Sequence, residues 1–204
     1  MHLLTEAKKI ATTKKITAGK SDAYVISQKP KATHWYVITG GPGSGKTTTV
    51  NLLAAKGYKT TIEHARHYID TQLIKGRTVE EVRKNQTEFQ LEILQMQIEQ
   101  EASLDPNEIV FLDRAIPDAL AYYHFLKLPI DERLTDSISG ISYKKVFMLD
   151  TLPIVNDYAR REDEKDQKRI HELLTNVYES LPFPVVHVPV LPPEERVNFI
   201  LKNL

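Results

Sequence analysis

The sequence contains no cysteine. This absence excludes disulfide bonds, thiolate metal sites and cysteine nucleophiles, and it agrees with a reducing compartment. Long hydrophobic runs are also missing: no apolar stretch approaches the ~18 residues that a membrane span needs. No segment has the charged start and apolar centre of a signal peptide. We therefore expect a cytoplasmic protein.

The chain also lacks an excess of charge of either sign, because 27 Lys and Arg residues balance 27 Asp and Glu residues. Without a net field there is no reason to expect a nucleic acid partner. A length of 204 residues is enough for one α/β domain with a sizeable core. We predict a basic N-terminal extension over residues 1–31 and one globular domain over residues 32–204.

The N-terminal extension is basic although the chain as a whole has no net charge. Residues 1–31 contain seven lysines but only two acidic residues, Glu6 and Asp22. Apolar residues at helical spacing near its start indicate an amphipathic helix. We favour a solvated helix packed on the domain. The alternative is contact with an anionic membrane through the lysines from Lys8 to Lys31, or with RNA.

What the chain does contain is a complete phosphate-binding loop. Residues 40–47 read Gly-Gly-Pro-Gly-Ser-Gly-Lys-Thr and match the pattern G-x-x-x-x-G-K-[ST] in full. Glycines let the chain curl so that successive backbone N–H groups converge on a phosphate. Lys46 would reach the β- and γ-phosphates, and Thr47 would offer its hydroxyl to Mg²⁺. The predicted nucleotide-binding residues are Gly41, Pro42, Gly43, Ser44, Gly45, Lys46, Thr47 and Thr48.

Both flanks of the loop have the structure that this motif requires. A β-branched and aromatic run at residues 35–39 predicts a strand before it. A helical pattern runs from Thr48 to Ala55 and ends near Gly57. The loop therefore predicts ATP or GTP with Mg²⁺ as ligands, without a choice between the two nucleotides.

The rest of the chain alternates strand-like and helical patterns. Further strands are predicted at residues 58–62, 109–112, 146–149 and 185–188. Helices are predicted at residues 64–74, 78–102, 115–126, 154–180 and from 192 onward, with a capping box of Thr78 and Glu81 at the start of the longest. Such alternation is typical of a mainly parallel sheet covered by helices on both faces, whose ligands bind at the carboxyl ends of the strands.

Asp113 follows the third strand, in the position of a Walker-B acid that holds Mg²⁺ directly or through water. Its alternative role is to cap the helix that begins at Ala115. The next residue is Arg114, where motor ATPases usually need a glutamate to activate water, so a strong ATP-driven machine is disfavoured. Arg114 suits an enzyme that grips a phosphate or hydroxyl of an acceptor.

Two further groups of charged residues are candidates for catalysis. Glu63 and Arg66 follow the second strand at i, i+3 spacing: Glu63 could accept a proton from a substrate hydroxyl, and Arg66 could clamp the acceptor. A surface ion pair is the alternative. Arg160 and Arg161 lie in a charged stretch where phosphotransferases carry a lid, and could neutralise charge on the transferred phosphoryl group. A solvated helix is the alternative there.

Several segments together resemble the NadR-type, AAA-28 family of P-loop kinase-like NTPases. The resemblance extends over about residues 33–203, and within it the pattern Asp113-Arg114-x-x-x-Asp118 points to the kinase-like branch. The segments that carry it are residues 40–48, 63–66, 111–123, 160–164 and 195–200.

The resemblance implies an α/β fold with three layers, a helical lid and a five-stranded parallel sheet in the order 2-3-1-4-5. It also implies ATP or GTP with Mg²⁺. By position it implies nucleotide and metal roles for Lys46, Thr47 and Asp113. It implies acceptor-side roles for Glu63 and Arg114, and a lid role for Arg160 or Arg161.

We therefore expect a Mg-dependent kinase that transfers the γ-phosphoryl group of ATP or GTP to a small, nucleoside-like hydroxyl. The alternative is a nucleotide switch with slow hydrolysis that binds a lipid head group or a protein partner. The Asp113-Arg114 and Glu63-Arg66 pairs favour the kinase, and the basic extension favours the switch. The sequence leaves the acceptor and the oligomeric state open.

Overall fold

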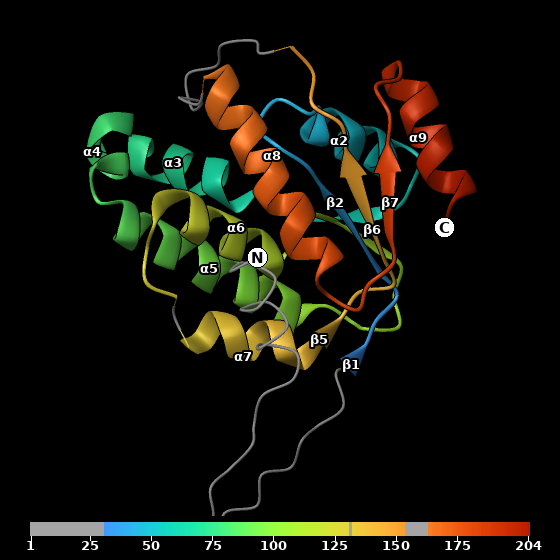
Figure 1. Ribbon diagram of the computed structural model, residues 1–204, viewed down its shortest axis with the longest axis horizontal. Helices are drawn as coiled ribbons and strands as arrows, with labels where there is room; N and C mark the ends of the chain where they lie inside the picture. The colour runs from blue at the N-terminus through green and yellow to red at the C-terminus, as the bar shows by residue number, and fades with distance from the viewer. Residues whose placement is uncertain (1–30, 131, 154–162) are drawn as a thin grey trace, which may run out of the picture.

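The computed structural model describes residues 31–130, 132–153 and 163–204 (Figure 1). Nearly all of the basic extension therefore lies outside the described residues, as do the lid candidates Arg160 and Arg161. No helix within the described part of the chain is both long and apolar enough to cross a membrane.

A five-stranded sheet forms the centre of the molecule, and all of its strand pairs are parallel. In spatial order its strands are β3 (Lys59–Thr60), β4 (Val110–Asp113), β2 (Trp35–Thr39), β6 (Lys145–Leu149) and β7 (Val185–Val188). Counted along the chain within this sheet, the order is 2-3-1-4-5, which confirms the α/β fold and the strand order implied by the family resemblance.

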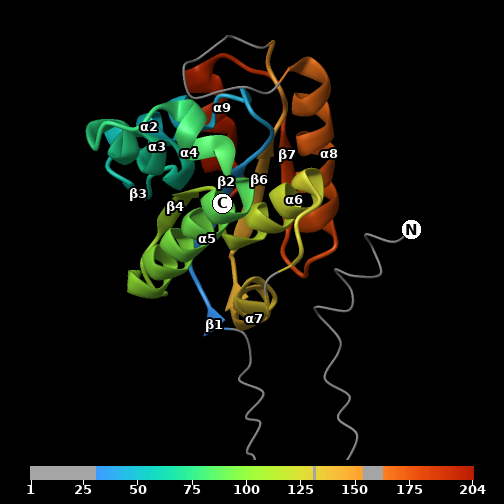
Figure 2. The ribbon, with the colours of Figure 1, turned by 90° about the vertical axis from the view of Figure 1, so that its left-hand side faces the viewer.

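Helices cover both faces of the sheet, as Figures 1 and 2 show. One face carries α2 (Lys46–Ala55) and α9 (Pro193–Lys202); the other carries α5 (Gln86–Ser103), α6 (Ile116–Leu126) and α8 (Glu164–Glu179). Alternate residues of a strand point to opposite faces, so Val37 packs in the core under α5, α6 and α8, while Ile38 packs in the core under α2 and α9.

The prediction of one long helix over residues 78–102 is wrong. The chain forms α4 (Val79–Lys84) and α5, with Asn85 between them in an extended conformation. The Asn85 side chain accepts a hydrogen bond from the Glu88 N–H at 3.2 Å and so caps α5. Val82 and Phe89 keep helical spacing across this break and share one apolar cluster, so periodicity alone did not mark it. The predicted capping box of Thr78 and Glu81 is present at the start of α4.

Two small features were not expected from the sequence. β1 (Lys31–Ala32) pairs in parallel with β5 (Ile141–Ser142), and α7 (Glu132–Gly140) precedes β5. Figure 1 shows them at the end of the molecule away from the arrowheads of β6 and β7. α3 (His64–Ile74) lies at the opposite end beside α4 and α5, where its Ile69 is buried in the same cluster as Val82. The candidate site is at this carboxyl end of the sheet.

Candidate nucleotide and acceptor site

The glycine-rich loop connects β2 to α2 at the carboxyl edge of the sheet. Gly40 has φ 144°, and a Cβ there would lie 2.5 Å from the Leu149 carbonyl oxygen. Gly45, which caps α2, has φ 81°. Both φ values lie in the region that residues other than glycine rarely adopt. The curled loop and its position next to β6 therefore depend on these two glycines.

Lys46 is buried against its own loop. Its Nζ donates to the carbonyl oxygens of Gly40 at 3.0 Å and Gly41 at 2.9 Å, and to Ser44 Oγ at 3.3 Å. Burial lowers the pKa of Lys46 to about 8, and the charge of Arg114 adds to this shift. The ammonium group is held by uncharged oxygen atoms, which leaves its charge available to a phosphate.

Asp113 ends β4 and is almost fully buried, at 3% exposure. Burial raises its pKa to about 7, and the nearby carboxylate of Glu63 adds to the shift. Its Oδ1 has no hydrogen-bond partner among the described residues. Ala115, not Asp113, is the N-cap of α6, so the alternative capping role is not the one observed.

An orphaned carboxylate oxygen close to a phosphate loop fits a Mg²⁺ ion. Magnesium takes one or two carboxylates and completes its shell with water and substrate phosphates. The hydroxyl of Thr47 lies on the exposed start of α2, beside the equally exposed Thr48. Asp113 and Thr47 are thus an oxygen donor set of the type that this ion prefers.

Arg114 is the central cation of a charge network beside the phosphate loop. Its Nε lies 3.4 Å from Glu63 Oε1, and its NH1 donates to Asp118 Oδ1 at 3.0 Å. The guanidinium carbon lies 5.3 Å from the centre of the Tyr122 ring. Arg114 has φ 68°, a left-handed conformation that costs roughly 1–2 kcal/mol for an ordinary residue. The two carboxylates hold the side chain in spite of this strain.

Glu63 lies between three cations. It is the N-cap of α3, and its second carboxylate oxygen is 3.9 Å from Arg66 Nε. Burial alone would raise its pKa, but the attraction of Arg114, Lys46 and Arg66 outweighs burial and lowers it. The Glu63-Arg66 pair is therefore part of a larger charge network, not the isolated surface pair considered as the alternative.

Asp118 is the main residue of this network that sequence reasoning missed, since it was noted only as part of a pattern. Besides Arg114, its carboxylate accepts hydrogen bonds from Thr39 Oγ1 at 2.6 Å, the Ala115 N–H at 3.1 Å and the Tyr178 hydroxyl at 2.5 Å. It joins β2, α6 and α8. Its position four residues after Arg114 on the first turn of a helix was the available signal.

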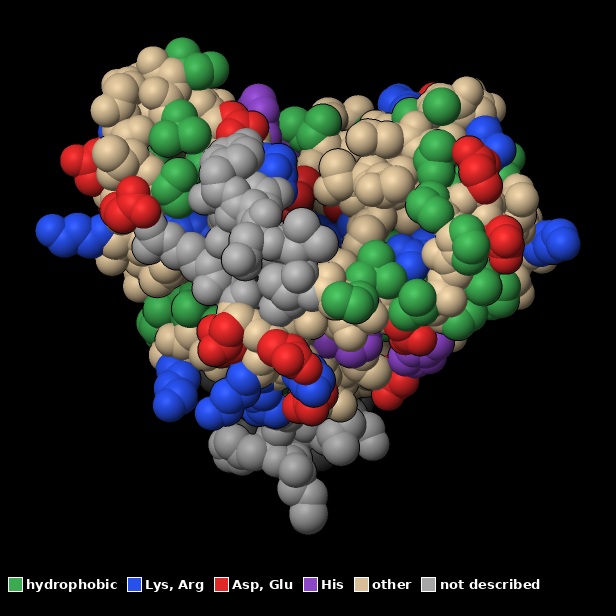
Figure 3. Space-filling model, turned by 90° about the horizontal axis from the view of Figure 1, so that it is seen from above, with side chains coloured by type: hydrophobic (Ala, Val, Ile, Leu, Met, Phe, Trp, Pro, Cys, Tyr) green, Lys and Arg blue, Asp and Glu red, His purple; other side chains and the backbone are tan. Residues whose placement is uncertain are grey.

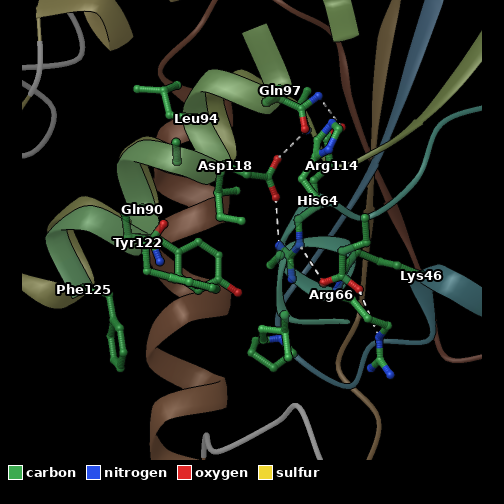
Figure 4. Close-up of a pocket in the computed structure, with 18 of the residues that line it drawn as sticks. Lys46, His64, Arg66, Gln90, Leu94, Gln97, Arg114, Asp118, Tyr122 and Phe125 are labelled. Carbon is green, nitrogen blue, oxygen red and sulfur yellow. Dashed lines mark hydrogen bonds and ion pairs between the residues drawn. The ribbon is translucent and has the colours of Figure 1, made fainter. Parts of the chain in front are cut away.

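A cavity of about 580 Å³ is lined by the phosphate loop, Glu63, Arg114 and Asp118, whereas Asp113 is not among its lining residues. The loop residues Gly43, Gly45 and Lys46 line one end. Glu63 and Arg114 lie on its wall, and the other end is lined by residues of α5 and α6 that include Gln90, Leu94, Tyr122 and Phe125. Figure 4 shows Lys46 and Phe125 on opposite sides of this pocket. Its volume is typical of a small-molecule site.

Figure 3 looks down on the carboxyl edge of the sheet and shows acidic and basic side chains next to each other near its middle. The structure thus brings the phosphate loop, Glu63, Arg66, Asp113 and Arg114 together at this edge. Arg160 and Arg161 lie outside the described residues.

The outer side of the phosphate loop has contacts that the sequence did not predict. Gln167 of α8 donates to the Pro42 carbonyl oxygen at 2.7 Å, and Arg196 of α9 donates to the Ser44 carbonyl oxygen at 2.7 Å. His171 Nδ1 lies 3.3 Å from the Gly41 N–H, which donates to it. These residues are more than a hundred positions from their partners, so no local motif could have indicated them.

The fold and the site define a P-loop protein of the kinase-like class. The sequence profile described as AAA domain (AAA_28) matches residues 35–196. The chain therefore belongs to this family, as the resemblance indicated. Comparison with curated proteins gives no match.

Several solved structures share the fold. Deoxyadenosine kinase from M. mycoides, solved with dCMP and dCDP, has a TM-score of 0.61 at 15% identity, covering 83% of this chain and 97% of that chain. A NadR protein in complex with NR has a TM-score of 0.58 at 18% identity, covering 84% of this chain and 51% of that chain.

Thymidylate kinase from Ehrlichia chaffeensis has a TM-score of 0.57 at 18% identity, covering 84% of this chain and 98% of that chain. At such identities the likeness shows a common fold.

Proposed function

We propose that this protein is a kinase that transfers the γ-phosphoryl group of ATP or GTP to the hydroxyl of a small, nucleoside-like acceptor. The observation that carries this proposal is a continuous cavity that leads from the phosphate loop past Glu63 and Arg114 to an aromatic end. A hydrolase or a switch needs room for water beside the phosphates, whereas a kinase needs a second chamber for its acceptor.

On the nucleotide side, the N–H groups of the loop and the ammonium group of Lys46 hold the phosphates. Thr47 and Asp113 would hold Mg²⁺, which when bound neutralises charge on the β- and γ-phosphates. Arg160 and Arg161 are proposed as the lid cations, on the basis of their sequence position alone.

On the acceptor side, Arg114 and Arg66 orient the acceptor, and Glu63 accepts its hydroxyl proton as the oxygen attacks the γ-phosphorus atom. The nucleoside diphosphate leaves in the same step. Because its pKa is lowered, Glu63 is ionised at neutral pH but is a weak base. Phosphoryl transfer through a loose transition state demands little activation of the nucleophile, so its main work is to align the hydroxyl.

The side chains at the far end of the cavity favour an acceptor with a planar ring. Tyr122 and Phe125 supply aromatic surface there, and the nearly buried amide of Gln90 can hydrogen-bond to a ring edge. This combination suits a nucleoside better than a sugar or an aliphatic alcohol.

The test separates transfer from hydrolysis. The protein is incubated with ATP or GTP, Mg²⁺ and each member of a nucleoside panel, and nucleoside diphosphate and free phosphate are measured separately. Diphosphate formation that depends on one acceptor, without free phosphate, supports the kinase. Slow release of free phosphate whatever the acceptor contradicts it and supports the switch, which the lysine-rich residues 1–31 favour. Lys46→Ala is the control and should abolish both signals.

A further inference from the structure

The phosphate loop is held from outside the cavity by two late helices. Gln167 and His171 come from α8 and Arg196 from α9, and none of them lines the cavity. Two of them donate to carbonyl oxygens of the loop, at Pro42 and Ser44. Their effect on a bound ligand would therefore act through the loop backbone.

Peptide geometry links these outer contacts to the inside of the loop. The described residues contain no cis peptide bond, and in a planar trans peptide the C=O and N–H groups point in opposite directions. The Ser44 carbonyl points to Arg196, so the N–H of Gly45, which belongs to the same peptide, points away from α9. Gly45 lines the cavity. Arg196 therefore fixes the direction of one N–H group of the phosphate cradle.

Of the three residues that contact the loop from outside, only Arg196 is charged. Gln167 has an uncharged side chain, and burial lowers the pKa of His171, which keeps that ring neutral. Arg196 is 3% exposed, its Nε has no hydrogen-bond partner among the described residues, and Asp150 is the carboxylate whose charge it feels. In the described part of the chain it forms no ion pair within 4.0 Å. A buried cation with so little compensation is costly, and an anion across the loop would offset that cost.

The contact between Arg196 and the loop is close. A Cβ on Gly45 would lie 2.6 Å from Arg196 NH1, so a side chain there would displace the guanidinium group. A hydrogen bond from a cation is stronger than a neutral one, and it polarises the peptide that accepts it. The N–H of Gly45 consequently becomes a better donor to a phosphate oxygen.

We propose that Arg196 is a positioning residue of the nucleotide site, which sets the affinity for the phosphates by orienting and polarising the Ser44–Gly45 peptide without touching the nucleotide. The inference rests on nucleotide binding at this loop as part of the proposed function, but it does not depend on the identity of the acceptor.

The experiment compares ATP with inorganic tripolyphosphate, each with Mg²⁺, by calorimetry. Arg196→Gln should weaken both by about tenfold, because the lost contact acts on the phosphates alone. Arg196→Lys, which keeps the charge, should weaken both by less. Arg169→Gln, on the exposed face of α8, is the matched control and should change neither.

Unequal losses would overturn the proposal. If ATP binding weakens while tripolyphosphate binding does not, Arg196 contacts the base or ribose. If neither weakens, the contact with Ser44 is only structural.

A second measurement needs no nucleotide. In the proton–nitrogen NMR spectrum, loss of the polarising contact in Arg196→Gln should move the Gly45 amide proton upfield, while Arg169→Gln leaves it in place. An unchanged Gly45 signal would overturn the polarisation argument. If the wild type binds none of ATP, GTP and tripolyphosphate, the proposed function fails and the effect of Arg196 on affinity fails with it, while the Gly45 signal still tests whether Arg196 polarises the Ser44–Gly45 peptide. If Arg196→Gln does not fold, calorimetry and the NMR measurement are both made on Arg196→Lys.

Discussion

The two ends of the cavity are lined by different parts of the chain. The nucleotide end is built from backbone N–H groups of the loop at residues 40–47, held in place by donors from α8 and α9. The proposed acceptor end is built from side chains that bind each other, with Arg114 between Glu63 and Asp118. Every nucleotide presents phosphates, which backbone groups can recognise, whereas choice of an acceptor needs side chains of a particular shape and charge.

The two ends also differ in the kind of single substitution that they tolerate. A backbone cradle fails when its conformation changes, whatever the side chains are, and glycine positions are therefore its weak points. A network of paired charges fails when one partner is removed, because the other stays buried and unpaired. The expected effects of single substitutions separate the two ends accordingly.

The largest effect is expected at Arg114. Arg114→Ala should lower kcat by about 10²–10³-fold, the usual cost of one oriented donor in an active site. Affinity for ATP should stay within about twofold, because the phosphate loop is unchanged. Steady-state kinetics and calorimetry measure the two quantities.

The truncation leaves Asp118 without its ion-pair partner and Glu63 without its nearest cation. Arg114→Lys is therefore the second variant, and Arg169→Ala is the exposed control. A collapse of nucleotide affinity in folded Arg114→Lys would show that the two ends are not separate.

The next effect is expected in the loop itself. Gly40→Ala would put a Cβ 2.5 Å from the Leu149 carbonyl oxygen and 2.9 Å from Ser44 Oγ. We expect the free energy of unfolding to fall by about 3 kcal/mol, from backbone strain and overpacking together, and nucleotide binding to be lost.

Gly76→Ala is the matched control for this substitution. It also has a positive φ, of 85°, but a Cβ there would meet nothing within 4 Å. It should cost about 1 kcal/mol, from strain alone. Urea unfolding of both variants tests the difference, and equal losses would mean that space around Gly40 is not limiting.

The smallest effect is expected at a buried carboxylate that joins α5 to the start of α6. Glu101 of α5 is buried outside the cavity, where it accepts hydrogen bonds from Gln97, the Ile116 N–H and the Tyr143 hydroxyl. Burial raises its pKa from 4.5 to about 7. The folded state thus binds its proton more tightly than the unfolded state, and stability falls as pH rises from about 4.5 to about 7.

Relative to Glu101→Gln, the wild type should lose about 1–3 kcal/mol of stability over this range. Urea unfolding at pH 4.5 and pH 7.5 measures the slope, with Glu99→Gln on the exposed side of the same helix as the control. Parallel slopes in the wild type and Glu101→Gln would refute the titration of Glu101 in this window.

The sequence was most informative where the structure is local. The phosphate loop and the strand and helix that flank it were predicted from residues 35–55, and the strand order followed from the family resemblance. The continuous helix over residues 78–102 was a wrong prediction, because the spacing of Val82 and Phe89 fits a helix even though Asn85 interrupts it. For the candidate site, the sequence indicated charged residues close to the carboxyl ends of strands, such as Glu63 and Arg114.

Contacts between residues far apart in the sequence could not be predicted from the sequence. Asp118 binds Tyr178, which lies sixty positions away, and Arg196 binds Ser44 across 152 positions. Nothing in the sequence near either residue names its partner. Helix packing on the sheet brings these groups together, and packing depends on the shape of all the buried side chains.

The sequence by itself determined that a glycine-rich turn between a buried strand and a helix would converge its N–H groups, because φ and ψ preferences act within a few residues. Only the tertiary structure decided which donors hold the outer carbonyl oxygens of that turn, and which carboxylates bind the guanidinium group of Arg114. Those choices follow from where α6, α8 and α9 pack, since hydrogen bonds and ion pairs form only over a few ångströms.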